Sequence, residues 1–203
     1  GADTAATSYT LKAAIEKIGA FDLIFAGRQA IDGDTAQVGP QVAEKLGIPQ
    51  ITYAESVVDL KGREIIVNRA FDLGSELVQC QLPCLLTVVS SANQPRPPSV
   101  RKKIAAKMAA IPAEYPDLLE KHPNFESAEA LEDHLVDRNL KITVWTAADL
   151  VVDEADLGLS GSPTQVYKVN FVVLEATESK EIAPTPEGIR DLIDELVKEY
   201  IVG

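Results

Sequence analysis

The first half of the chain alternates short apolar runs with amphipathic stretches, a pattern typical of an α/β protein. A first helix is expected to begin at a Thr7 or Ser8 cap and to end at Gly19. Further elements expected here are strands at 23–26, 50–53 and 85–89, a helix at 38–46, and an edge hairpin formed by 57–60 and 64–68. Strands that alternate with helices imply a mostly parallel, Rossmann-like sheet covered by helices.

The second half of the chain is less regular. Prolines make residues 93–99 extended, and a basic helix with Arg101, Lys102, Lys103 and Lys107 follows. The acidic segment 112–140 contains one helix that Ser127 caps. The remaining elements expected are a late strand at 144–146 and a last helix that opens at Thr185-Pro186 and has a broad apolar face.

The loop between the strand at 23–26 and the helix at 38–46 is the main candidate for a binding site. Backbone N–H groups in the first turn of a helix lack partners and lie at the positive end of the helix dipole, so they bind phosphate. The candidate residues are Asp34, Thr35, Ala36, Gln37 and Val38, with Thr4 and Thr7 assisting from the start of the first helix. The alternative is an ordinary strand-to-helix turn, because the loop has no G-x-G-x-x-G motif and no Walker lysine.

Two strand ends are expected to converge beside this loop. Arg28 follows the strand at 23–26, and Ser90 follows the strand at 85–89. Ligands of open α/β sheets lie just beyond the carboxyl ends of such strands. Arg28 and Ser90 are therefore predicted to line one crevice together with the phosphate loop.

Composition and charge narrow the class of protein. The chain has 203 residues, 46% of them hydrophobic, and no apolar run reaches the roughly 20 residues of a membrane-spanning helix. A formal net charge of −12 argues against a nucleic-acid partner, because such partners require a basic surface. Cys80 and Cys84 are expected to be buried free thiols, which fits a reducing, cytoplasmic compartment. We find neither a catalytic constellation nor a metal-ligand pattern.

The amino-acid sequence of the loop resembles the signature of the electron-transfer flavoprotein small (β) subunit. The family reads Lys or Arg and then Gln-Ala-Ile-Asp, which stands here at 28–32, before a variable segment that ends in Gly. Further segments similar to the family lie at 2–8, 82–88, 93–96 and 157–166. The resemblance covers nearly the whole chain apart from the acidic insert.

The variable segment 33–38 is similar to the version in flavin-bifurcating members, whose small subunit carries a second FAD. The resemblance then implies that NADH reduces this FAD by hydride transfer. One electron passes to ferredoxin, and the other passes through the FAD of the large (α) subunit to an acyl-CoA or related dehydrogenase. Two alternatives remain open, a non-catalytic subunit that holds structural AMP and a stand-alone adenine-nucleotide-binding regulatory module.

The resemblance also suggests how the chain is organised. Residues 1–150 would form the nucleotide-binding domain, of the adenine-nucleotide-binding type, without the first strand that family members have. Residues 151–203 would form an arm and a helix that contact the large subunit. The segment at 93–107 includes the family's loop that docks onto dehydrogenases.

Overall fold

The computed structural model of the chain describes residues 1–169, 180–199 and 201. They divide into two compact units, Gly1–Gln165 and Val166–Gly203. Part of the predicted arm, at 170–179, lies outside the described residues. The helices and strands of the first unit are α1 (Thr4–Ile18), β1 (Leu23–Gly27), α2 (Val38–Leu46), β2 (Gln50–Lys61), β3 (Glu64–Phe71), β4 (Gly74–Gln81), β5 (Cys84–Val88), α3 (Val100–Met108), α4 (Tyr115–Lys121) and α5 (Ala128–Asp137).

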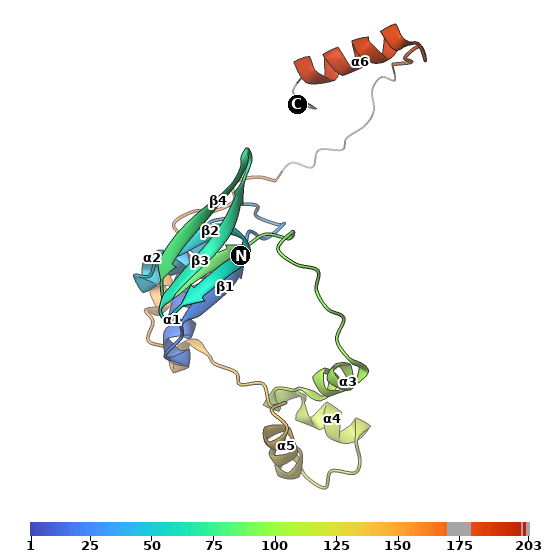
Figure 1. Cartoon of the computed structure of the whole chain (residues 1–203). Helices are drawn as coiled ribbons and strands as arrows, with labels where there is room; N and C mark the ends of the chain where they lie inside the picture. The colour runs from blue at the N-terminus through green and yellow to red at the C-terminus, as the bar shows by residue number, and fades with distance from the viewer. Residues whose placement is uncertain (170–179, 200, 202–203) are drawn as a thin grey trace. The chain divides into compact units, whose positions relative to one another are not determined.

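The described strands form one sheet in the order β1-β5-β2-β3-β4. β5 lies between β1 and β2 and is parallel to both, whereas β3 is antiparallel to β2 and to β4. Figure 1 shows the strongly twisted strands with α1 and α2 beside them. The α/β class predicted from the sequence is confirmed, with β1, β5 and β2 as its parallel part.

The central strand β5 serves two cores because successive side chains of a strand point to opposite faces. Leu85 joins Val42 and Ala43 of α2, and Ile15 of α1 packs against this cluster. Leu86 and Cys84 face the other way and pack with residues from β2 and β3. The helices α1 and α2 therefore cover the same face of the sheet, and the curled antiparallel strands enclose the other core.

The predicted hairpin between β2 and β3 is confirmed, but its place at the sheet edge is not. β4 pairs along β3 from Gly74 to Gln81 and forms the edge on that side of the sheet. The sequence analysis missed β4 because its inward residues, Val78 and Cys80, alternate with polar ones over too short a run to stand out.

The start of α1 differs from the prediction. Asp3, and not Thr7 or Ser8, is the N-cap, and its carboxylate accepts a hydrogen bond from the Ala6 N–H at 3.0 Å. Ser8 is fully buried within the helix, and its hydroxyl donates to the Ala5 carbonyl. The second carboxylate oxygen of Asp3 accepts hydrogen bonds from Thr164, far away in the sequence.

The predicted late strand at 144–146 is wrong. These residues are irregular and lead into 3-10 turns at Ala147–Asp149 and Glu154–Asp156. Polar contacts with α1 hold this segment instead of a strand ladder. Lys17 lies over the Trp145 ring and donates to the Asp149 carbonyl at 2.6 Å, and the Asp153 N–H donates to the Tyr9 hydroxyl at 2.9 Å.

The arm continues along α1 toward the start of that helix. The hydroxyl of Ser162 accepts a hydrogen bond from the Asp3 N–H at 2.8 Å, and Thr164 donates to the Asp3 carboxylate. Contacts therefore run from Lys17, near the end of α1, to its cap. Residues 145–164 form a strap along α1, so the first part of the segment that we expected to need a partner packs on its own unit.

The insert has a small core of its own. Tyr115, Leu131 and Leu135 are buried together with Ala110, and Phe125 packs against them. Ser127 caps α5 as predicted, and backbone bonds between Ala110 and the segment 140–142 close the base of this substructure.

The second unit contains α6 (Pro186–Lys198), and its predicted start is confirmed. Thr185 caps the helix with Pro186 at the first position. Its apolar residues Ile189, Ile193 and Val197 are about half exposed within this unit. No helix among the described residues is both long and apolar enough to cross a membrane.

Candidate functional site

The loop after β1 leads into a helix start that no side chain caps. Gln37 precedes α2, and its side chain makes no capping hydrogen bond. The N–H of Gln41 closes the first turn on the Gln37 carbonyl at 2.9 Å, and Pro40 has no N–H. The N–H groups of Val38 and Gly39 therefore lack helical acceptors and are suited to an anion.

Within the loop, two non-glycine residues have a positive φ. Asp34 has φ 49° and Ala36 has φ 53°, with Thr35 between them. When right-handed and left-handed backbone conformations alternate, successive N–H groups point to the same side and can form a concave anion-binding site. The Asp34 N–H itself donates to the Ala30 carbonyl, and its carboxylate accepts from Gln29. Asp34 therefore shapes the loop, and its N–H is not free for a phosphate.

The starts of α1 and α2 are joined by side-chain hydrogen bonds. The Thr4 hydroxyl donates to the Gln37 side-chain oxygen at 3.1 Å, and the Gln41 side chain donates back to Thr4 at 3.3 Å. Thr7 lies one turn further along α1, where its N–H donates to the Asp3 carbonyl. Two of the predicted residues, Thr4 and Gln37, are therefore brought together, whereas Thr7 has only its hydroxyl to offer.

A crevice of about 470 Å³ lies at the carboxyl ends of the parallel strands. Arg28 follows β1, and its N–H donates to the Val88 carbonyl at the end of β5, at 3.1 Å. Ser90 lies two residues beyond β5. Arg28 and Ser90 line the same crevice, as the strand-end argument expects. The predicted phosphate loop does not join them, because none of residues 33–38 lines this crevice.

The crevice also contains residues that sequence reasoning missed. The missed residues are Tyr53 from β2 and Arg69, Ala70, Phe71 and Asp72 from the end of β3, whereas Val89 and Ser91 line the crevice beside the predicted Ser90. Tyr53 and the residues of β3 reach the crevice through the antiparallel hairpin, whose place in the strand order the pattern of the chain does not reveal. The one available signal was Arg69, a cation that interrupts the apolar alternation of β3.

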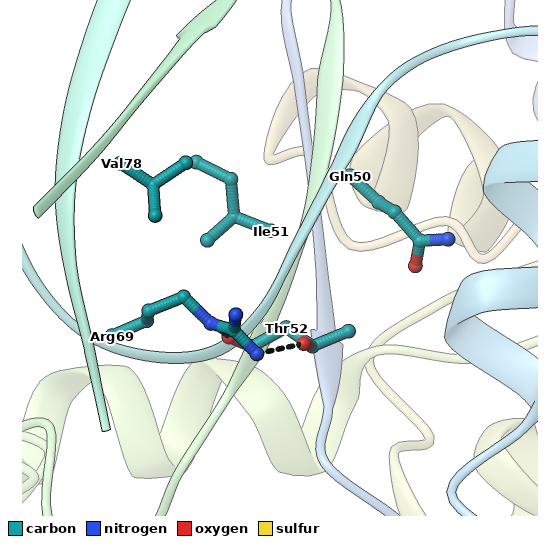
Figure 2. Close-up of a pocket in the computed structure, with 5 residues that line it drawn as sticks. All are labelled: Gln50, Ile51, Thr52, Arg69 and Val78. Atoms are coloured by element: carbon teal, nitrogen blue, oxygen red, sulfur yellow. Dashed lines mark hydrogen bonds between the residues drawn. The ribbon is translucent and has the colours of Figure 1, made fainter. Parts of the chain in front are cut away.

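Arg69 is held rigidly between this crevice and a smaller cavity of about 280 Å³. Figure 2 shows its guanidinium group turned toward Thr52. Its nitrogens donate to the Thr52 carbonyl at 2.9 Å and to the Thr52 hydroxyl at 2.8 Å, and a third bond reaches Glu76 at 2.8 Å. The guanidinium is therefore fixed in place beside the crevice, with the Glu76 carboxylate as its ion-pair partner.

The thiols lie apart from this chemistry. Cys80 and Cys84 are free; Cys84, the first residue of β5, is fully buried as expected, whereas Cys80 in β4 is only half-buried. Burial, and with it the neighbouring Cys80, raises the pKa of the Cys84 thiol to about 12. The thiol therefore stays protonated, as expected of a packing cysteine. Among residues 1–169, 180–199 and 201, no cluster of His, Cys, Asp or Glu could hold a metal ion.

The parallel strands, the crevice at their carboxyl ends and the uncapped helix start define an α/β protein with its site where this class binds nucleotides. Comparison with known proteins identifies the class more closely. Residues 1–117 match the electron transfer flavoprotein domain. The chain belongs to the electron transfer flavoprotein family, and relatives matched across its length are β subunits.

Three of the similar proteins are each 40% or 41% identical to this chain. The electron transfer flavoprotein subunit beta of Clostridium acetobutylicum is 41% identical over 100% of this chain and 62% of its own length. That of Megasphaera elsdenii is 40% identical over 99% of this chain and 64% of its own. Subunit CarD of the caffeyl-CoA reductase-Etf complex of Acetobacterium woodii is 40% identical over 83% of this chain and 52% of its own. The chain thus spans less than two thirds of each of these relatives.

Proposed function

We propose that the chain is the FAD-binding small subunit of a cytoplasmic, heterodimeric electron-transfer flavoprotein of the bifurcating type. The observation that carries the proposal is the uncapped start of α2 beside a crevice lined by Arg28 and Ser90. The start of α2 offers amide donors to phosphates, and the crevice offers a separate space for a ring. A dinucleotide needs both.

The residues fit the phosphate end of such a cofactor. Thr35, Ala36, Gln37 and Val38 would offer backbone N–H groups, and Thr35 would add its hydroxyl. Thr4 would hold Gln37 in place through the bond that links α1 to α2. Because the chain carries a formal net charge of −12, the local amides and Arg28 must supply the attraction for the phosphates.

The crevice fits the ring end. Its volume of about 470 Å³ lies within the range of ligand pockets, which is roughly 300–1,000 Å³. Arg28 lies over the Tyr53 ring at 5.6 Å, and Ser90 and Ser91 contribute hydroxyl groups. When bound, the flavin supplies hydride acceptance from NADH and single-electron transfer to ferredoxin and to the large-subunit FAD.

The same proposal includes two protein partners. The large subunit would cover apolar residues that remain exposed beyond the strap, such as Val166 and Tyr167, and the apolar residues of α6. A dehydrogenase would dock at α3, whose N-cap is Ser99 and whose exposed residues include Arg101, Lys102 and Lys103. One relative, subunit CarD, is named as part of a caffeyl-CoA reductase-Etf complex, which supports a partner of this kind.

The decisive experiment is to co-purify the chain with its large subunit, extract the nucleotides, and quantify FAD and AMP per heterodimer. Two FAD per heterodimer, with NADH oxidation, is the expected result. One FAD with one AMP would instead identify the non-bifurcating alternative, and a chain that purifies alone with bound adenine nucleotide would identify the regulatory module.

Arg28→Ala tests the crevice directly. Loss of flavin or of NADH oxidation without loss of folding is expected. Arg63→Ala is the matched control, because Arg63 bonds Asp22 and the Leu82 carbonyl at the amino ends of the parallel strands, the opposite edge of the sheet. Unchanged flavin content and activity in Arg28→Ala would contradict a role for Arg28.

A further inference from the structure

Tyr53 has a left-handed backbone in the middle of a strand. Its φ of 57° lies in a region that bulky residues rarely adopt. The pairing of β2 with β5 shifts register between Ile51 and Ala54, so Tyr53 lies at an irregularity of the ladder. Strain of this kind persists only where the surroundings hold it, and it clusters at ligand sites.

Thr87 is the residue that holds this conformation. Its hydroxyl accepts a hydrogen bond from the Tyr53 N–H at 3.1 Å, and Thr87 is 2% exposed. Its methyl group packs so closely on α2 that a Cβ at Gly39 would lie 2.7 Å from Thr87 Cγ2. One buried side chain therefore connects the start of the phosphate helix to the strained residue of β2.

The strained backbone places Tyr53 at the crevice. The ring lines the crevice, and the Arg28 guanidinium lies 5.6 Å from its centroid. An aromatic ring in contact with a guanidinium forms a surface on which flat, conjugated ring systems stack. The fixed Arg69 and the hydroxyls of Ser90 and Ser91 add polar partners for the edge of such a ring.

We propose that Tyr53 is a ligand-contact residue that selects a flavin dinucleotide over AMP. Its ring and Arg28 form the wall against which the isoalloxazine ring packs. AMP has no isoalloxazine ring, so it gains nothing from this wall. The inference rests on the function proposed above and adds the residue that distinguishes the two ligands.

The test uses the chain co-purified with its large subunit and three variants. Tyr53→Gly removes the ring, and glycine suits a left-handed backbone, so this variant is expected to melt no lower than the wild type. Tyr53→Phe keeps the ring. Arg63→Ala, at the opposite edge of the sheet, is the control.

The measurements are FAD and AMP affinities for nucleotide-stripped protein, the visible spectrum of the bound flavin, and the melting temperature. Tyr53→Gly should weaken FAD by about tenfold or more, the size of effect expected when a stacking partner is lost, and should leave AMP affinity unchanged. Tyr53→Phe and Arg63→Ala should both match the wild type.

Wild-type FAD affinity and spectrum in Tyr53→Gly would overturn the inference while the proposed function stands. Equal losses of FAD and AMP would also overturn it, because Tyr53 would then act through Thr87 on the phosphate loop. A wild type that binds AMP but no FAD would refute the proposed function itself, and this inference with it.

Discussion

Asp3 and Thr164 are 161 positions apart in the chain, yet both the N–H and the hydroxyl of Thr164 donate to one carboxylate oxygen of Asp3, at 2.9 and 2.8 Å. The other oxygen accepts from Ala6 and caps α1. The residue that starts the helix therefore also fastens the strap that runs along it. Thr4, which follows Asp3, is the residue that bonds to Gln37 at the phosphate loop.

Stability should depend on pH through this carboxylate. The Ala6 N–H, and then the Thr164 hydroxyl and N–H, lower the pKa of Asp3 below its usual value. Because the folded pKa is the lower one, the stabilisation is present above the unfolded pKa and disappears as the pH falls through the folded pKa. Asp3→Asn should lower the melting temperature at neutral pH, and the difference should close in acid.

Melting curves across the acid range test this dependence. Asp133→Asn, an exposed carboxylate on α5, is the matched control and should show no pH-dependent difference from the wild type. A gap between Asp3→Asn and wild type that stays constant down to strongly acidic pH would show that the loss is not one of charge.

Gly39 is required by packing. Its Cβ would lie 2.7 Å from Thr87 Cγ2 and 3.5 Å from Ala26 Cβ, so Gly39→Ala must push α2 away from the sheet. We expect a loss of about 1–3 kcal/mol in the free energy of unfolding, measured by urea denaturation. Gly33→Ala, at a loop glycine with open space around it, is the control and should stay near wild type. Equal stability of both variants would show that α2 tolerates the shift.

The insert should unfold separately from the sheet because its core is a separate cluster. Leu131→Ala, at a fully buried leucine, should cost about 2–5 kcal/mol locally. Tyr115→Phe should be neutral or stabilising, because the buried hydroxyl of Tyr115 has no hydrogen-bond partner among the described residues. Amide hydrogen exchange should become faster in α4 and α5 of Leu131→Ala and remain slow in β5; faster exchange in β5 as well would mean that the two cores are coupled.

Two truncations separate the strap from the rest of the arm. A chain that ends at Gln165 keeps Ser162 and Thr164 and should melt like the full chain, but it should lose the large subunit. A chain that ends at Asp156 also loses the bonds to Asp3 and should melt at a lower temperature. Co-purification and melting curves distinguish these effects. Undiminished binding of the large subunit by the shorter chains would show that the arm makes no essential contact.

Local signals predicted most of the individual elements. The span of α2, its stop at Gly47, the caps at Ser127 and Thr185, and the hairpin turn at Gly62 all follow from residues adjacent in sequence. Residues 144–146 do not form the predicted strand, because their contacts are with α1, far away in the sequence. The cap of α1 is a different kind of error, since Asp3 accepts from the nearby Ala6 N–H and a local signal for it was available.

The residues of the candidate site also fall into two groups, those set by neighbouring residues and those set by long-range pairing. By itself, the sequence determined the strand–loop–helix unit with Arg28 and the amides of 35–38, because a strand end and a helix start are set by neighbouring residues. Only the tertiary structure decided that Tyr53 and Arg69 join Arg28 and Ser90 in one crevice. Their meeting depends on strand order, on the register shift in β2 and on the bond from Tyr53 to Thr87. These are long-range pairings, and burial across the sheet selects them, whereas periodicity along the chain does not.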